Sequence, residues 1–431
     1  MAGGLIIILM IAVALFRSLT SGASTPGGSL PFFEQLYEDE IAGPGRFPVQ
    51  LASAQPTDLC TLCDCGAAVP FYAPNAQASA NFGLPSRPPA TDVYPTPDTV
   101  DVNEFICLTI LDIYCARQHL IDQQALRLVA RTANHLPEMM AWSLSGLQIG
   151  KPTIYMTTAT SPTMKSGRWN TFRPQYFRRH GRMMRSWMVQ QEARVLKAKS
   201  DLGSAVRDWQ VVWIIAEDSI EIDPLVVRIL QRTGISFVYF AYGMTKSWGN
   251  AQKNAVLQMV YALSRAGTSG LYGHGPVYGL DDDNKILPNL LDRLIEVVRL
   301  GVFPVGNLSG DDGWEKALID ETLSVVVGGL FDYGSFTYNS TVLGTLISGP
   351  SFWKITEHAG EHAFLAQFGP LQSFELLCGK SKAQDCHNVW HNEPLTKVEM
   401  LTDEEEIAYV RKYGAAKLFQ ELGFSAVTSK D

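Results

Sequence analysis

The sequence predicts an α/β fold, with a mainly parallel sheet and helices on both of its faces. Two observations predict it. From Lys151 onward, short runs of β-branched and aromatic residues alternate with longer segments of helical periodicity. Strand–helix alternation of this kind places crossover helices on both faces of one sheet. The 431 residues, of which 46% are hydrophobic and 18% charged, are also enough to bury a large core.

Five short apolar runs are the predicted strands of this sheet. They occupy residues 153–158, 211–215, 235–240, 277–280 and 302–305. Three amphipathic segments are the predicted helices, at residues 223–234, 254–264 and 288–300. The first helix is the best defined, because Asp223 suits an N-cap, Pro224 suits the first turn and Gly234 suits the C-terminal stop.

The chain before Lys151 has a different composition, and we divide it into three segments. Residues 1–20 contain an apolar run that is shorter than the ~20 residues that span a bilayer. This run suits a signal anchor or a signal peptide, although no basic residue precedes it, and a buried N-terminal helix is the alternative. Residues 21–100 are rich in Pro, Ser and Ala and predict a stem, while residues 101–150 predict a helical extension. The α/β domain is then residues 151–431.

Composition also restricts the partners and the compartment of the protein. The formal net charge of −8 argues against nucleic acid as the main partner. Among the seven cysteines, Cys60, Cys63 and Cys65 cluster without a nearby fourth ligand, which is a weak zinc signal. Glycosylation sequons begin at Asn307 and Asn339. Together with the N-terminal apolar run, the sequons favour entry into the secretory pathway.

A basic tract separates the first two predicted strands, within residues 165–199. Aromatic side chains interleave with its cations, which are Arg168, Arg173, Arg178, Arg179, Arg182, Arg185, Arg194, Lys197 and Lys199. Three interpretations are open: a solvated helix face, a surface for an anionic glycan or lipid headgroup, and a nucleic-acid patch.

The most informative motif is the acidic run Asp-Asp-Asp-Asn at residues 281–284, directly after a predicted strand. Ligands of open α/β sheets bind beyond the carboxyl ends of the strands. Carboxylate oxygens suit Mg²⁺ or Mn²⁺, which commonly also take phosphate oxygens as ligands. The run therefore predicts a metal site for a diphosphate, and a solvated acidic turn is the alternative. A calcium loop of the EF-hand type is excluded, because Ile286 and Asp292 stand where that loop needs Gly and Glu.

A second chemical motif is the H-x-x-E-H pattern formed by His358, Glu361 and His362. This pattern is the inverted zinc-peptidase motif, in which two histidines and a glutamate at helical spacing bind zinc and activate water. Gly360 weakens the helix that the motif requires. A zinc peptidase is therefore kept as a remote alternative.

Taken together in chain order, eight motifs between residues 151 and 396 resemble glycosyltransferase family 43, the β-1,3-glucuronyltransferases and their plant xylan-synthesis relatives. No single motif decides the match, which depends on their common order and comparable spacing. They are the strand and loop at 153–160, Trp-Ile-Ile-Ala-Glu-Asp-Ser at 213–219, Gly-Asn-Ala-Gln-Lys-Asn-Ala at 249–255, the acidic run at 281–284, Val-Phe-Pro-Val-Gly at 302–306, Asp-Tyr-Gly-Ser-Phe at 332–336, Gly-Glu-His-Ala-Phe-Leu at 360–365 and Val-Trp-His at 389–391.

The resemblance implies a GT-A-type, Rossmann-like mixed sheet and an inverting transfer of a sugar from a UDP-sugar to a glycan hydroxyl, with Mn²⁺ or Mg²⁺ as cofactor. It implies one catalytic residue, the general base Glu361, one acceptor-binding residue, Asp332, and one metal ligand, Asp283. The donor would be bound by Thr157, Thr158, Asp218, Gln252, Lys253, Asn254, Asp281, Asp282 and His391. The resemblance also implies a Golgi membrane protein of the single-pass type II class, with its catalytic domain in the lumen and its N-terminal segment in the membrane. It leaves homodimerisation open.

The chain also departs from the family pattern. The family has Thr-Arg-Thr-Glu after its Trp-His, and that arginine helps to hold the donor phosphates, whereas this chain has Asn392, Glu393 and Pro394. An arginine expected near Trp248 is also missing. The donor sugar therefore stays open between glucuronic acid, xylose and similar sugars. A non-catalytic scaffold or binding subunit of a glycan-synthesising complex is the main alternative function.

Overall fold

The protein is described from a computed structural model. The described residues are 50–51, 102–118, 138–144, 146–162, 173–200, 207–245, 249–265, 271–287, 289–306, 314–315, 317–320, 322–323, 325–343, 353–354, 360–377, 388–391 and 395–422. The chain divides into two compact units, residues 1–38 with 403–431 and residues 39–402. In the first unit the described part is a pair of helices, α13 (Asp403–Tyr413) and α14 (Ala415–Glu421), which are joined at Gly414.

The second unit is built on a mixed sheet of nine strands in the order β1-β2-β5-β4-β3-β6-β13-β8-β14. Strands β5, β4, β3 and β6 run parallel in the middle, and antiparallel pairs flank them on both sides. The strands are β1 (Gln50–Leu51), β2 (Met140–Ser143), β3 (Thr153–Thr160), β4 (Gln210–Glu217), β5 (Ser236–Ala241), β6 (Pro276–Gly279), β8 (Leu300–Val302), β13 (Phe336–Asn339) and β14 (Glu375–Leu376). The α/β class predicted from the sequence is confirmed.

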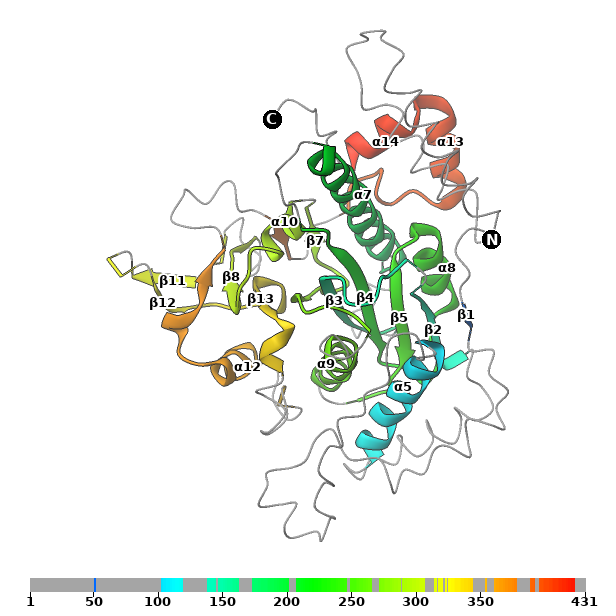
Figure 1. Cartoon of the computed structure of the whole chain (residues 1–431). Helices are drawn as coiled ribbons and strands as arrows, with labels where there is room; N and C mark the ends of the chain where they lie inside the picture. Colours follow the sequence, from blue (N-terminus) through cyan, green and yellow to red (C-terminus); the bar gives the residue numbers. More distant parts are fainter. Residues whose placement is uncertain are drawn as a thin grey trace. The chain divides into compact units, whose positions relative to one another are not determined.

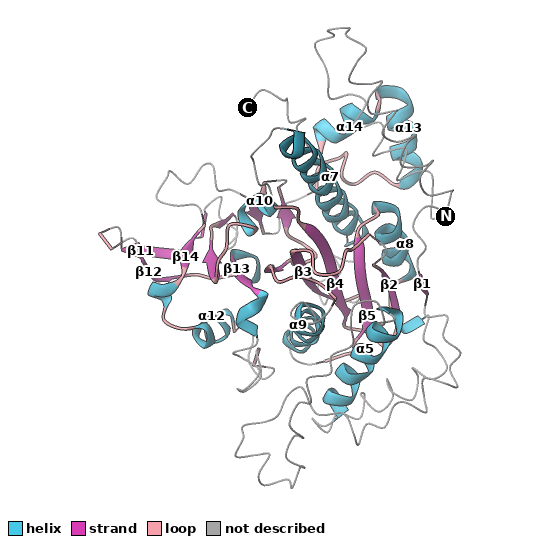
Figure 2. Ribbon diagram, viewed as in Figure 1, coloured by secondary structure: helices cyan, strands magenta, loops and turns pink. Residues whose placement is uncertain are grey.

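The central strands are apolar on both faces because helices cover both faces. Every residue of β4 and of β5 is buried, which is the near-continuous pattern that parallel strands show between helical layers. Helices α7 (Arg173–Ser200) and α8 (Pro224–Thr233) pack together on one side of the sheet, and α9 (Asn250–Arg265) and α5 (Val102–Gln118) on the other (Figure 1). Figure 2 shows the strands as a layer between these helices.

Two smaller sheets extend the unit beyond the central sheet. One has four strands in the order β10-β9-β15-β7, which are β7 (Lys285–Ile286), β9 (Val305–Gly306), β10 (Trp314–Glu315) and β15 (Val389–Trp390). The other is a hairpin of β11 (Ala317–Asp320) and β12 (Val325–Gly329). Short helices connect these parts: α10 (Leu290–Leu294), α12 (Glu361–Leu365) and the 3₁₀ turns η2 (Tyr333–Ser335), η3 (Ser340–Val342), η4 (Ala366–Phe368) and η5 (Leu371–Ser373).

Most predicted elements are present, with instructive differences. Helix α8 begins after the N-cap Asp223, whose side chain accepts a hydrogen bond from the Leu225 N–H, and ends at Gly234 in the left-handed conformation. The predicted helix at 288–300 is only the short α10, and the predicted strand at 302–305 is divided between β8 and β9. Within the predicted helical extension α5 is a helix, but residues 140–143 form strand β2, which pairs antiparallel with β5.

The N-terminal predictions fall mostly outside the described residues. The apolar run at residues 4–16 lies outside them, as does the predicted stem apart from β1, which pairs with β2 at the sheet edge. Within the part of the chain that the structure describes, no helix is both long enough and apolar enough to cross a membrane.

Candidate functional site

The candidate site lies at the carboxyl ends of the parallel strands. Strand β3 ends at Thr160, β4 ends at Glu217, and the acidic run begins two residues after β6 ends. Because these three strands are parallel neighbours, their carboxyl ends share one edge of the sheet. This edge is where open α/β sheets bind ligands.

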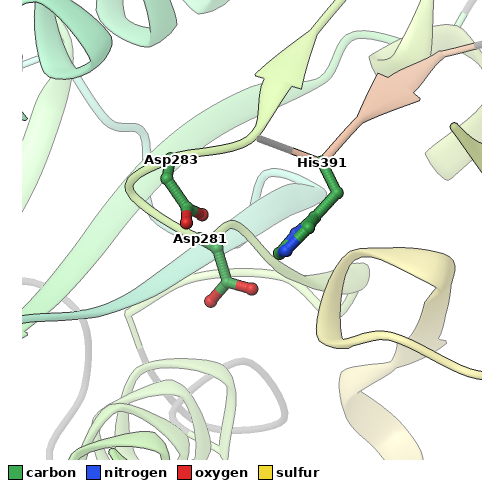
Figure 3. Close-up of side chains that lie close together, drawn as sticks. All are labelled: Asp281, Asp283 and His391. Carbon is green, nitrogen blue, oxygen red and sulfur yellow. The ribbon is translucent and has the colours of Figure 1, made fainter. Parts of the chain in front are cut away.

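Three side chains at this edge form a candidate metal centre. Asp281, Asp283 and His391 each offer one ligand atom, and these atoms lie within 4.8 Å of one another. Figure 3 shows the side chains of Asp281 and Asp283 close together, with the imidazole of His391 directed toward them. The chain brings His391 here because β15 pairs antiparallel with β7, with Trp390 opposite Lys285, so that the end of β15 adjoins the acidic run. The two carboxylates suit Mn²⁺ or Mg²⁺, and the imidazole is a common ligand of transition metals.

The electrostatics of the cluster favour a bound cation. Burial raises the pKa of Asp281 well above its ordinary value, and the nearby carboxylates Asp332, Asp283 and Asp282 raise it further against the opposing charge of Lys253. Burial and Asp282 raise the pKa of Asp283 to about 6, and His391 opposes this rise. Like charges that are crowded and desolvated in this way are relieved by a divalent ion.

Asp282 takes part in a different network, one that the sequence did not reveal. Its carboxylate accepts a hydrogen bond from the hydroxyl of Thr160, and that hydroxyl also accepts from Arg173 Nη1 at 3.3 Å. The Arg173 guanidinium binds both oxygens of Glu217 at 2.8 and 3.3 Å and an oxygen of Asp223 at 2.8 Å. Burial raises the pKa of Asp282, and Thr160 and Arg173 oppose the rise.

Arg173 belongs to the basic tract and is the first residue of α7, and its position corrects the interpretation of that tract as a solvated helix face. Arg173, Arg179 and Arg182 on α7 are all buried, at about 3–5% exposure. Arg179 pairs with the buried Glu399, as Arg173 pairs with Glu217. Among the cations of the tract that the structure describes, Arg194 and Lys197 are exposed, and Arg194 pairs with Asp292.

A second cluster at the site surrounds Lys253 on α9. Its ammonium lies 3.6 Å from Glu361 Oε1, 4.3 Å from the ring centre of Tyr333 and 4.5 Å from that of Trp353. Such contacts of an ammonium with aromatic faces are attractive. The neighbouring Asn254 holds Trp353 in place, with its amide donating to the Trp353 carbonyl at 2.9 Å and accepting from the Trp353 N–H at 2.8 Å.

Glu361 is presented by a backbone turn that requires glycine. Gly360 has φ of 102°, and helix α12 begins directly after it at Glu361. The H-x-x-E-H pattern needs a helix that passes through this position, and the left-handed Gly360 interrupts it. His362 is exposed and packs edge-on against Phe331, while His358 lies outside the described residues. The geometry around Gly360 therefore argues against the zinc-peptidase alternative.

Asp332 lies between the two clusters. One of its carboxylate oxygens caps the turn η2 by accepting from the Gly334 N–H at 2.7 Å, and the other lies 3.8 Å from His391 Nδ1. The turn packs tightly against β6, since a Cβ at Gly279 would lie 2.6 Å from the ring of Tyr333. The predicted acceptor residue and the predicted donor residue His391 are thus neighbours.

Asp218 and Gln252 are also brought together, at the end of β4. Asp218 Oδ1 accepts from the Thr245 N–H at 2.8 Å and from Gln252 Nε2 at 2.7 Å. Gln252 therefore fixes the Asp218 carboxylate, which follows Glu217 directly in the sequence. This pairing supports a joint role for the two residues.

Two other residues that were predicted to bind the sugar donor make hydrogen bonds within the protein. The Thr157 hydroxyl donates to the Tyr278 carbonyl at 3.0 Å and lies 2.9 Å from the Tyr333 hydroxyl. The Thr158 hydroxyl donates to the Leu280 carbonyl at 2.6 Å and accepts from the Trp213 indole N–H at 2.9 Å. These buried hydroxyls hold the start of the acidic run against β3. Their predicted contact with a nucleotide, like that of Asn254, stays a prediction.

Comparison with known proteins agrees with this geometry. Residues 204–336 match the sequence model of glycosyltransferase family 43, a region that contains β4, α9, the acidic run and Asp332. No curated protein matches the chain at a significant level. The match confirms the family predicted from the motifs over residues 204–336: this region is similar to glycosyltransferase family 43, which supports a glycosyltransferase.

Proposed function

We propose that this glycosyltransferase inverts the anomeric centre while it moves a sugar from a UDP-sugar to a glycan hydroxyl, with Mn²⁺ or Mg²⁺ bound at Asp283. One observation carries the proposal. The cluster of Asp281, Asp283 and His391 lies at the carboxyl edge of the parallel strands, and Lys253 stands close enough to interact with both Asp281 and Glu361. This proximity supports a shared site for the candidate metal centre and the candidate general base.

In this mechanism Glu361 removes the proton from the acceptor hydroxyl as the hydroxyl attacks the donor sugar. The ion pair with Lys253 fixes the Glu361 carboxylate, and Tyr333 and Trp353 fix Lys253 in turn. Asp332 would hydrogen-bond the acceptor sugar and orient it. A bound divalent ion would supply charge neutralisation for the departing diphosphate.

The remaining residues would bind the donor. Asp218, held by Gln252, would contact the uracil, and Asp282, held by Thr160, would lie near the ribose. His391 would lie near the diphosphate. Because Lys253 is already paired with Glu361, it is less available to a carboxylate on the donor sugar. The pairing favours xylose or another neutral sugar over glucuronic acid.

We also propose the cellular setting that the sequence implies, which is a Golgi membrane with the catalytic domain in the lumen. The apolar run at residues 4–16 and the sequons at Asn307 and Asn339 support it. The Asn339 side chain caps the turn η3 by accepting from the Thr341 N–H at 3.1 Å, at a half-buried position on the surface.

A specific observation keeps the scaffold alternative open. The chain has Glu393 where the family has the arginine that helps to hold the donor phosphates. Loss of such a bidentate contact removes a strong, charge-assisted interaction. A scaffold would bind UDP together with a metal ion but would catalyse no sugar transfer.

The test is a panel of UDP-sugars with Mn²⁺, scored separately for binding by calorimetry and for sugar transfer or hydrolysis. If the protein is an active transferase, at least one UDP-sugar should be both bound and turned over. Binding without turnover for every donor supports the scaffold. Absence of binding for every donor contradicts both functions.

A further inference from the structure

The sequon at Asn339 lies where strand β13 ends and the turn η3 begins. Its middle residue, Ser340, is buried. The Ser340 hydroxyl accepts a hydrogen bond from the Gly275 N–H at 3.3 Å and lies 3.0 Å from Nδ1 of His274. The middle residue therefore anchors the sequon to the segment before β6. The other sequon, at Asn307, lies outside the described residues.

The two outer residues of the sequon contact each other at the surface. Asn339 is half-buried and Thr341 is exposed. The Asn339 side-chain oxygen accepts from the Thr341 N–H at 3.1 Å and from the Thr341 hydroxyl at 3.0 Å, and both hydrogen bonds are solvent-exposed. A turn of this kind, closed by an asparagine side chain on the backbone two residues on, is a common local conformation.

This turn uses only the oxygen of the Asn339 carboxamide. Asn339 Nδ2 makes no hydrogen bond to any residue that the structure describes, and the fold does not enclose it. The nitrogen that N-glycosylation would modify is thus available at the surface, while the rest of the sequon is held in place. A bulky, solubilising group on this nitrogen would break no hydrogen bond of the folded chain.

A substituent on Asn339 would also lie away from the candidate functional site. Strand β13 runs antiparallel to β6, and Asn339 lies opposite Pro276, the first residue of β6. The acidic run follows the other end of β6, and the four residues of this strand separate its ends by roughly 10 Å at about 3.3 Å per residue. Asn339 is therefore at the amino edge of the parallel strands, whereas the candidate site is at their carboxyl edge.

We propose that Asn339 carries an N-linked glycan. The donor is a lipid-linked oligosaccharide diphosphate in the lumen of the secretory pathway, and Asn-x-Thr is the acceptor pattern. A bond forms between Asn339 Nδ2 and the anomeric carbon of the donor, the bond from that carbon to the diphosphate breaks, and one amide proton is released with the lipid diphosphate. The inference rests on the proposed secretory setting, and it does not depend on the metal centre or on the general base.

The experiment expresses the tagged full chain in a eukaryotic host and locates the glycan by peptide mass spectrometry before and after treatment with peptide-N-glycosidase. This enzyme removes the glycan and leaves aspartate at the modified position. We expect that conversion at position 339 in the wild type and in Thr341→Ser, which keeps the hydroxyl, and its loss in Thr341→Ala. Asn339→Asp keeps the oxygen that caps the turn and lacks the amide nitrogen, so it should fold and carry no glycan at this position. Asn307→Asp is the matched control, and it should keep the glycan at Asn339.

The location of the protein and its affinity for UDP separate the possible failures. Wild-type protein that reaches the Golgi without a glycan on Asn339, or with one on Asn307 alone, would overturn the inference and leave the proposed setting intact. Protein that stays in the cytosol would overturn the setting and the inference together. Glycosylated wild type and Asn339→Asp should bind UDP with Mn²⁺ equally well, and weaker binding by the glycosylated protein would contradict the placement of the glycan away from the candidate site.

Discussion

Replacement of Arg173 by methionine tests the buried network that supports the acidic run. The Arg173 guanidinium binds Glu217, whose side chain is completely buried, and Asp223, which caps helix α8. Methionine keeps much of the volume and removes the charge, so that among the described side chains Glu217 keeps the hydrogen bond from the Tyr239 hydroxyl alone. Removing one partner of a buried ion pair commonly costs about 3–5 kcal/mol, because a charge is left buried without compensation. We expect Arg173→Met to lower the free energy of unfolding by that amount.

The pH dependence of this loss has a definite sign. Burial already raises the pKa of Glu217, and Arg173 opposes the rise. Without Arg173 the folded-state pKa moves further above its unfolded value, so protonation favours the folded state. The variant should therefore be closest to the wild type at low pH and should lose stability as the pH rises through the folded-state pKa of Glu217.

Urea unfolding at several pH values measures this difference. Arg194→Met is the matched control, because it removes a similar pair with Asp292 from the same helix, but one that is 44% and 34% exposed. Exposed pairs contribute about 0–1 kcal/mol. The double variant Arg173→Met with Glu217→Gln should recover part of the lost stability. Equal losses for Arg173→Met and Arg194→Met would refute the reasoning.

Three further predictions concern the site and the compartment. Glu361→Gln should leave UDP binding near normal and lower the rate of sugar transfer by ~10²–10⁴-fold, whereas His358→Ala should lower that rate far less. Complete loss of activity in both variants, together with loss of bound zinc, would favour the peptidase. Asp281→Asn should raise the thermal midpoint of the metal-free protein at pH 7.5, because it removes a carboxyl group whose pKa is raised by burial and by Asp332. The same variant should be stabilised less by Mn²⁺ than the wild type is. A lower thermal midpoint of the metal-free variant would contradict this account of the cluster. Full-length tagged protein should reach the Golgi with a sequon glycosylated, and a cytosolic protein without glycosylation would count against the proposed setting.

The sequence predicted the elements that local signals define. Asp223, Pro224 and Gly234 mark both ends of α8, and the burial of β4 and β5 follows from their continuous apolar runs. The acidic run was placed correctly at a strand end, since the run and the strand are adjacent in the chain. The predictions that depended only on neighbouring residues were thus the most secure.

The parts that sequence reasoning missed depend on long-range contacts. Arg173 appeared as one cation of a basic tract, and its partners Glu217 and Asp223 lie 44 and 50 residues away. The contact between Asn284 and His391 spans 107 residues. Strand β2 was missed because its four residues form a strand only by pairing with β5. Each of these features needs the folded sheet to bring its parts together.

The most direct test of the central claim is calorimetry of UDP binding to the wild type and to Asp283→Ala, each with and without Mn²⁺. The account predicts that the wild type binds UDP much more tightly with Mn²⁺ than without it, and that Asp283→Ala stays folded and loses this dependence. The same UDP affinity for both proteins in the presence of Mn²⁺ would contradict the assignment of the acidic run as the metal site.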